Sequence, residues 1–376
     1  MRDSSEHLAA RMVGIGFGGT SPSADARDLL RRGVRNVIFF ARNVESPQQF
    51  FELTATVKSA VAGPLMTSVD QEGGRVLRLR EPFTLVPSMR QVGQAADDNL
   101  AYAVGRILAR ELRAVNLDMN LAPVLDVDTN PSNPVISSRS FGGSPQLVAR
   151  LGASLVRGLQ DHGVGSCAKH FPGHGDTNKD SHHELPVLPR HDLERMFKVE
   201  LPPFIAAVDA GVAAVMTAHV IYPHLDELPG TLSRTIINGL LRQRLGFRGL
   251  VMTDDMQMKA IADHYGFDEA IVLAANAGVD LLWICHSPDL QNRAIDVLIR
   301  AVESGKLSRQ RLEESARRLD VVMNQYVNPP AAKLDLSAIG APEHQVIADR
   351  IEQLAGITIG IETEDPTESF VRQQQT

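Results

Sequence analysis

Apolar residues along this chain follow two alternating patterns. Short runs that are apolar on both faces predict buried strands at residues 12–17, 36–41, 65–70, 117–126, 163–168, 213–219, 249–255 and 280–286. Between these runs, apolar residues recur every three or four positions and predict helices at 23–32, 46–61, 100–115, 145–162, 191–210, 236–245, 267–277, 290–304 and 308–326. Gly33 is expected to end the first of these helices, and Pro47 to begin the second.

Strands that alternate with helices predict an α/β fold, in which helices cover both faces of a parallel sheet. Two architectures fit: a closed (β/α)8 TIM-type barrel and an open doubly wound sheet. We expect the barrel, because about eight strands are present and polar residues stand at their carboxyl ends, which converge at a barrel mouth. These polar residues are Asp70, Asp126, Lys169, His170, His219, Asp254 and His286. The glycines at 14–19 lack the spacing of a dinucleotide-binding fingerprint.

The alternating pattern stops at Pro329 and Pro330. We therefore expect a barrel domain at residues 1–328 and a short C-terminal extension at residues 329–376. Within the extension, residues 346–354 have helical periodicity and residues 357–361 are apolar like a strand. The polar residues from 362 onward are expected to be disordered.

Composition excludes several classes of function. Of the 376 residues, 43% are hydrophobic and 22% are charged, which is ordinary for a globular protein. A net charge of −7 argues against a nucleic-acid partner, and four Tyr and one Trp offer little surface for base stacking. No apolar run approaches the roughly 20 residues that cross a bilayer. We therefore expect neither a nucleic-acid nor a membrane partner.

The first residues and the cysteines indicate the cellular compartment. The first residues, MRDSSEH, are polar and lack the apolar core of a signal peptide, so we expect a cytoplasmic protein. Cys167 and Cys285 both lie in apolar runs. Buried free thiols are the expected state of such a pair, and they suit a reducing compartment.

The densest group of titratable residues follows the fifth predicted strand, at residues 169–186. Its sequence, KHFPGHGDTNKDSHHELP, is broken by proline and glycine and therefore predicts a loop. A solvated surface loop is the simple alternative. Titratable groups on a loop that is held by a strand end more often take part in function.

Carboxylates and basic residues at a barrel mouth favour the chemistry of sugars or phosphate esters. Glycoside cleavage needs one carboxylate at the anomeric carbon and a separate acid that protonates the leaving oxygen. Asp254 follows an apolar strand and is the candidate nucleophile, with the cap of a following helix as its alternative role. Because side chains alternate along a strand, Asp255 is expected to point the other way and to be structural.

A histidine with an aspartate close by in sequence is the candidate general acid. Asp180 lies two residues before His182, so its carboxylate can orient the imidazole. Histidine titrates near neutral pH and can protonate a leaving oxygen and then activate water. A zinc or manganese site is the alternative, with ligands drawn from His170, His174, Asp176, Asp180, His182 and His183. Proline and glycine separate His170 from His174, so these two do not share a helix face as in a helical zinc motif.

Five segments resemble the glycoside hydrolases of family 3. They are DQEGGRV at 70–76, KHFPGHGDT at 169–177, DSH at 180–182, LS at 232–233 and TDDM at 253–256. The similarity extends in order from residue 12 to residue 326, and it is strongest to the bacterial β-N-acetylglucosaminidases of peptidoglycan recycling. The resemblance implies a (β/α)8 barrel and a retaining reaction through a covalent glycosyl-enzyme, without a metal or other cofactor.

The resemblance also implies roles for single residues. Asp254 matches the nucleophile, and His182, paired with Asp180, matches a general acid/base on a mobile loop. Five residues match positions that bind the hydroxyls and acetamide of the terminal sugar: Asp70, Arg78, Arg139, Lys169 and His170. Charge-assisted hydrogen bonds suit this task, although each arginine could instead be an ordinary salt-bridge partner. Met216 and His219 are expected to form or support the wall of the site.

The expected substrate is terminal β-linked GlcNAc on peptidoglycan-derived muropeptides or on chitooligosaccharides. A β-N-acetylglucosaminide phosphorylase on the same scaffold is an alternative, because a histidine acid/base does not repel a phosphate dianion. A metal-dependent hydrolase, a β-glucosidase and a catalytically inactive sugar-binding protein are further alternatives. His174 and His183 are left without a role.

Overall fold

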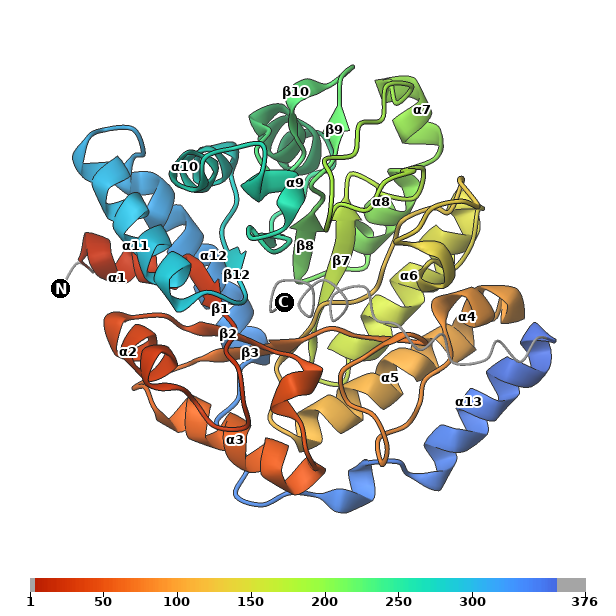
Figure 1. Ribbon diagram of the computed structural model, residues 1–376. Coiled ribbons are helices and arrows are strands. Elements are labelled where there is room, and N and C mark those ends of the chain that lie inside the picture. Colours follow the sequence, from red (N-terminus) through yellow and green to blue (C-terminus); the bar gives the residue numbers. More distant parts are fainter. Residues whose placement is uncertain (1–3, 357–376) are drawn as a thin grey trace.

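The computed structural model describes residues 4–356, and its centre is a ring of parallel strands surrounded by helices (Figure 1). The eight strands lie in the order β11-β8-β7-β6-β3-β2-β1-β12. Their bounds are β1 (Val13–Ile15), β2 (Asn36–Phe39), β3 (Met66–Val69), β6 (Met119–Asn120), β7 (Gly165–Phe171), β8 (Ala214–Thr217), β11 (Leu250–Thr253) and β12 (Leu282–Ile284). The two ends of the sheet meet where Met252 pairs with Leu281, whose carbonyl accepts the Thr253 N–H at 3.0 Å. The sheet is closed, which confirms the predicted (β/α)8 barrel.

Helices follow every barrel strand, and most of them form the outer ring of Figure 1. They are α2 (Ala24–Arg32), α3 (Pro47–Ser59), α5 (Asp98–Ala114), α6 (Pro145–Gln160), α7 (Leu193–Lys198), α8 (Pro202–Asp209), the π-helix η3 (Thr235–Arg244), α10 (Phe267–Ala277), α11 (Pro288–Glu303) and α12 (Arg309–Tyr326). Gly33 ends α2 with a φ of 122°, and Pro47 begins α3, as predicted.

Smaller elements decorate the barrel. A short helix precedes the first strand, two-stranded hairpins follow β3 and β8, and single turns of helix lie in the loops. Their bounds are α1 (Ser5–Arg11), η1 (Ala41–Asn43), β4 (Gln71–Gly73), β5 (Val76–Leu77), α4 (Met89–Ala95), η2 (Ser137–Arg139), β9 (Ile221–Tyr222), β10 (Asp226–Pro229), α9 (Lys259–Ala262) and η4 (Leu336–Ala338). The sequence patterns did not predict α1, α4 or the hairpins, which are too short for a clear period.

Two predicted elements were wrong in detail, each near a proline. The helix predicted at 191–210 is divided into α7 and α8, because Pro202 begins a new helix. The strand predicted at 117–126 keeps only the two ladder residues of β6, and Pro123 after it has no N–H to donate. The helix predicted at 236–245 is confirmed and is the π-helix η3.

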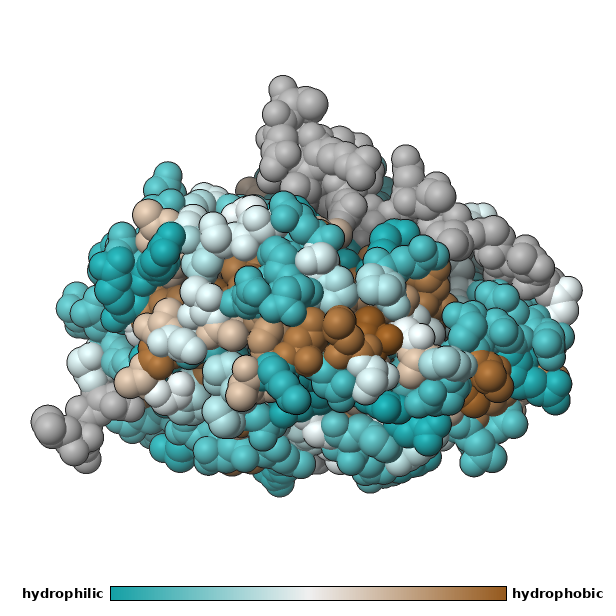
Figure 2. Space-filling model, turned by 90° about the horizontal axis from the view of Figure 1, so that it is seen from below, coloured by the Kyte–Doolittle hydropathy of each residue, from teal (hydrophilic) through white to brown (hydrophobic). Residues whose placement is uncertain are grey.

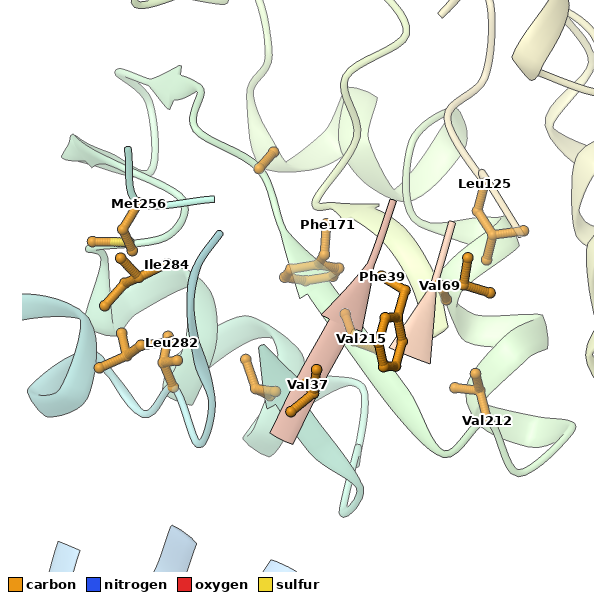
Figure 3. Packing of buried hydrophobic residues seen from close by; sticks show 14 of the residues in the cluster. Val37, Phe39, Val69, Leu125, Phe171, Val212, Val215, Met256, Leu282 and Ile284 are labelled. Atoms are coloured by element: carbon orange, nitrogen blue, oxygen red, sulfur yellow. The ribbon is translucent and has the colours of Figure 1, made fainter. Parts of the chain in front are cut away.

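Side chains along each strand alternate between the barrel interior and the layer beneath the helices. Ile38 and Phe40 belong to the interior cluster, while Val37 and Phe39 belong to the outer one, part of which Figure 3 shows. Residues of α12 join the interior cluster, and Tyr326 lies against the start of β7. Helix α12 therefore closes the amino-terminal end of the barrel and leaves the carboxyl end for chemistry.

Two early glycines serve the packing of the interior. A Cβ on Gly14 would lie 2.3 Å from Cε3 of Trp283, and one on Gly16 would lie 2.5 Å from the Cys285 carbonyl oxygen. Trp283 is 1% exposed and fills the interior. The glycine-rich run at 14–19 is thus explained in part by the space that Trp283 needs.

The C-terminal extension contributes helix α13 (Pro342–Ala355), which packs outside α4 and α5 (Figure 1). His344 of α13 lies 2.9 Å from the buried carboxylate of Glu111, which also accepts the N–H groups of Thr84 and Gly340. The helix predicted at 346–354 is confirmed. The strand-like run at 357–361 and the polar residues 362–376 lie outside the described residues.

The outer surface is mainly hydrophilic. Seen from the side of the barrel, hydrophilic residues cover most of the face, and a hydrophobic area lies near its middle (Figure 2). Among residues 4–356 we find no helix with the length and apolar character to span a bilayer. Cys167 and Cys285 are buried free thiols, as predicted.

Candidate active site

A cavity lies at the carboxyl ends of the barrel strands, opposite α12. The space at this site that no atom fills is ≈ 720 Å³, a volume that includes its open mouth. Most of the side chains that the sequence nominated line it: Asp70, Arg78, Arg139, Lys169, His170, His182, Met216 and Asp254. Asp180 and His219 do not line the cavity, but each contacts a residue that does.

Asp254 lies directly after β11, and its side chain is 27% exposed toward the cavity. Burial acts to raise the pKa of this carboxyl, but His170, His219 and His182 outweigh it and lower the pKa. Asp254 is therefore ionised at neutral pH. The next helix, α9, begins at Lys259 and has Met258 at its cap position, so Asp254 is not a helix cap.

Asp255 also lines the cavity, contrary to the prediction that it points away. Strand β11 ends at Thr253, so the alternation of side chains does not continue through this position. The Asp255 carboxylate accepts the N–H groups of Gln257 at 3.1 Å and Cys285 at 3.3 Å. These bonds hold the loop after β11 against the loop after β12, which is a structural role.

Asp180 and His182 form a local pair on the loop after β7. One carboxylate oxygen, Oδ1, lies 2.7 Å from the ring Nδ1 and accepts the backbone N–H of His182 at 2.8 Å. Burial acts to raise the pKa of Asp180, but its bonds to His182 prevail and lower it to about 2. An ionised carboxylate at Nδ1 fixes the ring's orientation and leaves Nε2 as the nitrogen for proton transfer.

Lys169, on β7, is the centre of a charged network that includes residues of the segment after β3. Its Nζ lies 2.6 Å from Oδ1 of Asp70 and 2.6 Å from Oε1 of Glu72. Glu72 also makes two parallel bonds of 2.8 Å to the guanidinium of Arg139. Arg78 lies 3.8 Å from the second oxygen of Asp70. Three cations and two carboxylates thus form one wall of the cavity.

Glu72 holds this network together, although the sequence patterns did not nominate it. It is 2% exposed, and the charges of Arg139 and Lys169 overcome the effect of burial and lower the pKa of its carboxyl. The pKa of Arg139 is raised in turn, because Glu72 outweighs the effect of burial. Asp70 and Glu72 are two residues apart, which was the signal that they could share a face.

His170 lies between two carboxylates. Its Nδ1 is 2.8 Å from Oδ2 of Asp126, and its Nε2 is 4.0 Å from Oδ2 of Asp254. Asp126 is fully buried and also accepts the backbone N–H groups of His170 and His174. Asp126 therefore orients His170 toward the nucleophile position, a role that its place at a strand end indicated only in general terms.

Met216 lies at the cavity surface, whereas His219 lies behind it. Met216 of β8 lines the cavity. His219 is 1% exposed, contacts the Thr231 hydroxyl at 2.7 Å and donates from Nε2 to the Asp255 carbonyl at 3.1 Å. Burial lowers the pKa of His219, so its ring is neutral and supports the loop after β11 from behind.

The loop histidines point to separate partners rather than to one shared position. The contacts are His170 to Asp126, His174 to Thr177 and Ser181, and His182 to Asp180. Within residues 4–356, no group of three or more His, Cys, Asp and Glu side chains could hold a metal ion. The metal-dependent alternative therefore has no ligand set in this part of the chain.

Comparison with known proteins agrees with this geometry. The family model described as glycosyl hydrolase family 3 N terminal domain matches residues 9–322. A β-hexosaminidase of Nitrosomonas eutropha is 38% identical over 313 residues, which cover 80% of this chain and 89% of that protein.

Solved structures give the same result. A glycoside hydrolase family 3 β-N-acetylglucosaminidase from Paenibacillus matches with a TM-score of 0.91 and 42% identity, covering 94% of this chain and 69% of that one. NagZ from Neisseria gonorrhoeae, in complex with N-trifluoroacetyl-D-glucosamine, matches with a TM-score of 0.77 and 33% identity, covering 92% and 98% of the two chains. The chain therefore belongs to glycosyl hydrolase family 3 and is a glycoside hydrolase.

Proposed function

We propose that the protein is a retaining exo-β-N-acetylglucosaminidase that releases terminal β-linked GlcNAc. The supporting observation is that an ionised carboxylate, Asp254, and an aspartate-oriented imidazole, His182, line one cavity. A carboxylate nucleophile together with a separate proton donor is the requirement of a retaining glycosidase. We assign these roles to Asp254 and to His182, with Asp180 as the residue that orients His182.

In the first step, Asp254 attacks the anomeric carbon while His182 gives a proton to the glycosidic oxygen. The bond to the aglycone breaks, and a covalent glycosyl-enzyme remains on the Asp254 carboxylate. The positive charge on His182 before this transfer is stabilised by Asp180.

In the second step, His182 takes a proton from water, and the oxygen of that water attacks the anomeric carbon. The bond to Asp254 breaks, and the sugar leaves with its original configuration after two inversions. A single residue thus acts as acid and then as base, which an imidazole can do because its ring nitrogen both gives and takes a proton.

The charged wall suits a polar, hydroxylated ligand. Carboxylates accept hydroxyl protons, and ammonium and guanidinium groups donate to hydroxyl and carbonyl oxygens. We assign the binding of the sugar's hydroxyls and acetamide to Asp70, Arg78, Arg139, Lys169 and His170, all of which line the cavity. Met216 supplies an apolar part of the wall, and His219 supports the site from behind.

The relatives support an N-acetylated sugar as substrate, since they are β-hexosaminidases and the neisserial structure holds an N-acylated glucosamine. We infer that the natural substrates are peptidoglycan-derived muropeptides or chitooligosaccharides. Two buried free cysteines support a reducing location, which for a bacterial enzyme of this type is the cytoplasm.

A panel of p-nitrophenyl glycosides, run with and without inorganic phosphate, tests the proposal. We expect release of p-nitrophenol from the β-GlcNAc substrate, much less from β-glucoside, and free GlcNAc as the product in both buffers. A rate that depends on phosphate and yields GlcNAc 1-phosphate would make the protein a phosphorylase. Binding of GlcNAc without any turnover would make it an inactive sugar-binding protein.

A further inference from the structure

His174 is a buried histidine of the loop that the proposed reaction does not use. It is 2% exposed, and each of its ring nitrogens contacts a hydroxyl group. Nδ1 lies 2.8 Å from Oγ1 of Thr177, and Nε2 lies 3.1 Å from Oγ of Ser181. A buried imidazole with both nitrogens engaged links the two groups that it contacts.

His174 itself is firmly held. Its backbone N–H donates to the buried Asp126 carboxylate at 2.7 Å, and its carbonyl accepts the side-chain N–H of Asn133 at 2.9 Å. Burial lowers the pKa of His174 to about 4, although the Asp126 charge acts in the opposite direction. The ring is neutral at the pH at which the enzyme works, so it offers one donor and one acceptor to its two hydroxyl partners.

Ser181 stands between the two residues of the catalytic pair, Asp180 and His182. It is 3% exposed, whereas Lys179 and His183 nearby are exposed. Besides the contact of its hydroxyl with His174, its carbonyl accepts the backbone N–H of Ala260 at 3.3 Å. The loop is therefore attached at Ser181 to the segment after β7 and, through α9, to the segment after the nucleophile strand β11.

We propose that His174 is a positioning residue, whose hydrogen bond to Ser181 sets the place of His182 over the cavity. This inference rests on the proposed role of His182 as acid/base. Because His182 adjoins Ser181, and Asp180 on the other side fixes the ring, a shift of Ser181 moves the whole pair. The bond thus connects the loop segment that carries Asp180 and His182 to His174, whose backbone N–H is bound to the buried Asp126 at the end of the barrel.

The test is the variant Ser181→Ala, compared with Ser181→Thr, which keeps the hydroxyl group. With p-nitrophenyl β-GlcNAc, a displaced His182 still permits the first step, because p-nitrophenol leaves with little protonation. The second step needs a base, so the glycosyl-enzyme accumulates. We expect kcat and KM of Ser181→Ala to fall together, on the order of fivefold for the loss of one hydrogen bond.

Azide supplies a readout that a general loss of structure would not give. The azide anion displaces Asp254 from the anomeric carbon without needing a base, so it should restore the kcat of Ser181→Ala and form β-GlcNAc azide. Ser181→Thr should behave as wild type, and so should the control Ser304→Ala, at an exposed serine that directly follows α11. If Ser181→Ala kept the wild-type kcat and KM, or lost activity without a response to azide, the positioning role would be wrong.

A double-mutant cycle assigns the effect to His174. In His174→Asn, the additional change Ser181→Ala should have little further effect on kcat, since the bond is already absent. Full additivity of the two losses would contradict the proposal. A thermal melt shows whether each variant is folded. Absence of turnover by the wild-type protein would refute the proposed function itself, which is a separate result.

Discussion

Replacing Glu72 with glutamine tests whether this residue organises the charged wall of the site. Its side chain is 1% exposed and contacts the guanidinium of Arg139 through both oxygens and the ammonium of Lys169 through one. Glutamine has nearly the same shape but no charge. Its amide nitrogen is a donor, so it would face the N–H groups of Arg139 or Lys169.

The expected loss of stability follows from burial. Removing one partner of a buried ion pair leaves the others without compensation and costs about 3–5 kcal/mol. Asp70 still neutralises part of the charge on Lys169, with an Nζ to Oδ1 distance of 2.6 Å, so we expect the lower end of this range. For a chain of 376 residues, an unfolding entropy of about 2.1 cal/mol/K per residue means that a loss of about 3 kcal/mol lowers Tm by roughly 4 °C.

The pH dependence of the difference has a definite sign. The folded pKa of Glu72 lies below its unfolded value, because Arg139 and Lys169 overcome the effect of burial. Its contribution to stability is therefore complete above the unfolded pKa of about 4.3 and is lost as pH falls from there toward the folded value. The difference in Tm between wild type and Glu72→Gln should be constant from about pH 6 to pH 8 and should shrink below about pH 4.

Thermal melts and kinetics with p-nitrophenyl β-GlcNAc at 20 °C check the prediction together. Because Lys169 and Arg139 are also proposed to bind the sugar, kcat/KM should fall roughly tenfold or more, mainly through KM. The matched control is Glu194→Gln, the same change in an exposed pair whose Lys198 Nζ to Oε1 distance is 2.6 Å. The side chains of that pair are 69% and 76% exposed, so the pair should contribute little to stability.

The reasoning fails if Glu72→Gln melts within about 2 °C of wild type at pH 7. It also fails if the variant is destabilised but keeps the wild-type KM, because then the wall would not depend on Glu72 for its geometry. A fall in Tm as large for Glu194→Gln would show that the change reflects net charge rather than the buried network.

Three further predictions concern catalysis and the extension. Asp254→Ala should abolish release of p-nitrophenol while Tm stays close to wild type, and near-normal activity would refute the nucleophile assignment. His182→Ala should slow aryl substrates mainly at sugar release, so that a burst of p-nitrophenol precedes slow turnover; a single slow phase without a burst would argue against the base role. A chain that ends at Asn328 should melt several degrees lower, because it leaves the buried Glu111 without its contact to His344, 2.9 Å away; an unchanged Tm would mean that α13 is energetically separate.

The sequence predicted the barrel and much of the cavity lining, because both depend on local features. A strand that is apolar on both faces is recognisable from a few residues, and the polar residue that ends it is the next in sequence. Asp70, Lys169 and Asp254 were found in this way, since all parallel strands of a closed barrel end at the same mouth. The apolar runs of the strands and the helical periodicity between them were clear enough to give the order of the elements.

Element boundaries were less predictable, because contacts between distant segments decide them. The run at 117–126 is apolar throughout, yet only Met119–Asn120 form ladder pairs with both neighbours. Asp255 reached the cavity because β11 ends one residue before the nucleophile. In both cases the sequence predicted the strand correctly and misjudged where its regular geometry stops.

The residues whose roles the sequence did not reveal act through other residues. Glu72 meets Arg139 across 67 positions of sequence, and Asp126 meets His170 across 44. No local pattern encodes such pairs, whereas the Asp180–His182 pair, only two residues apart, was evident at once. A polar residue at a strand end is recognisable from the strand before it, but a group that orients it needs only to be adjacent in space. The sequence therefore identified most of the charged residues that line the cavity, whereas the long-range contacts that orient them form only in the folded chain.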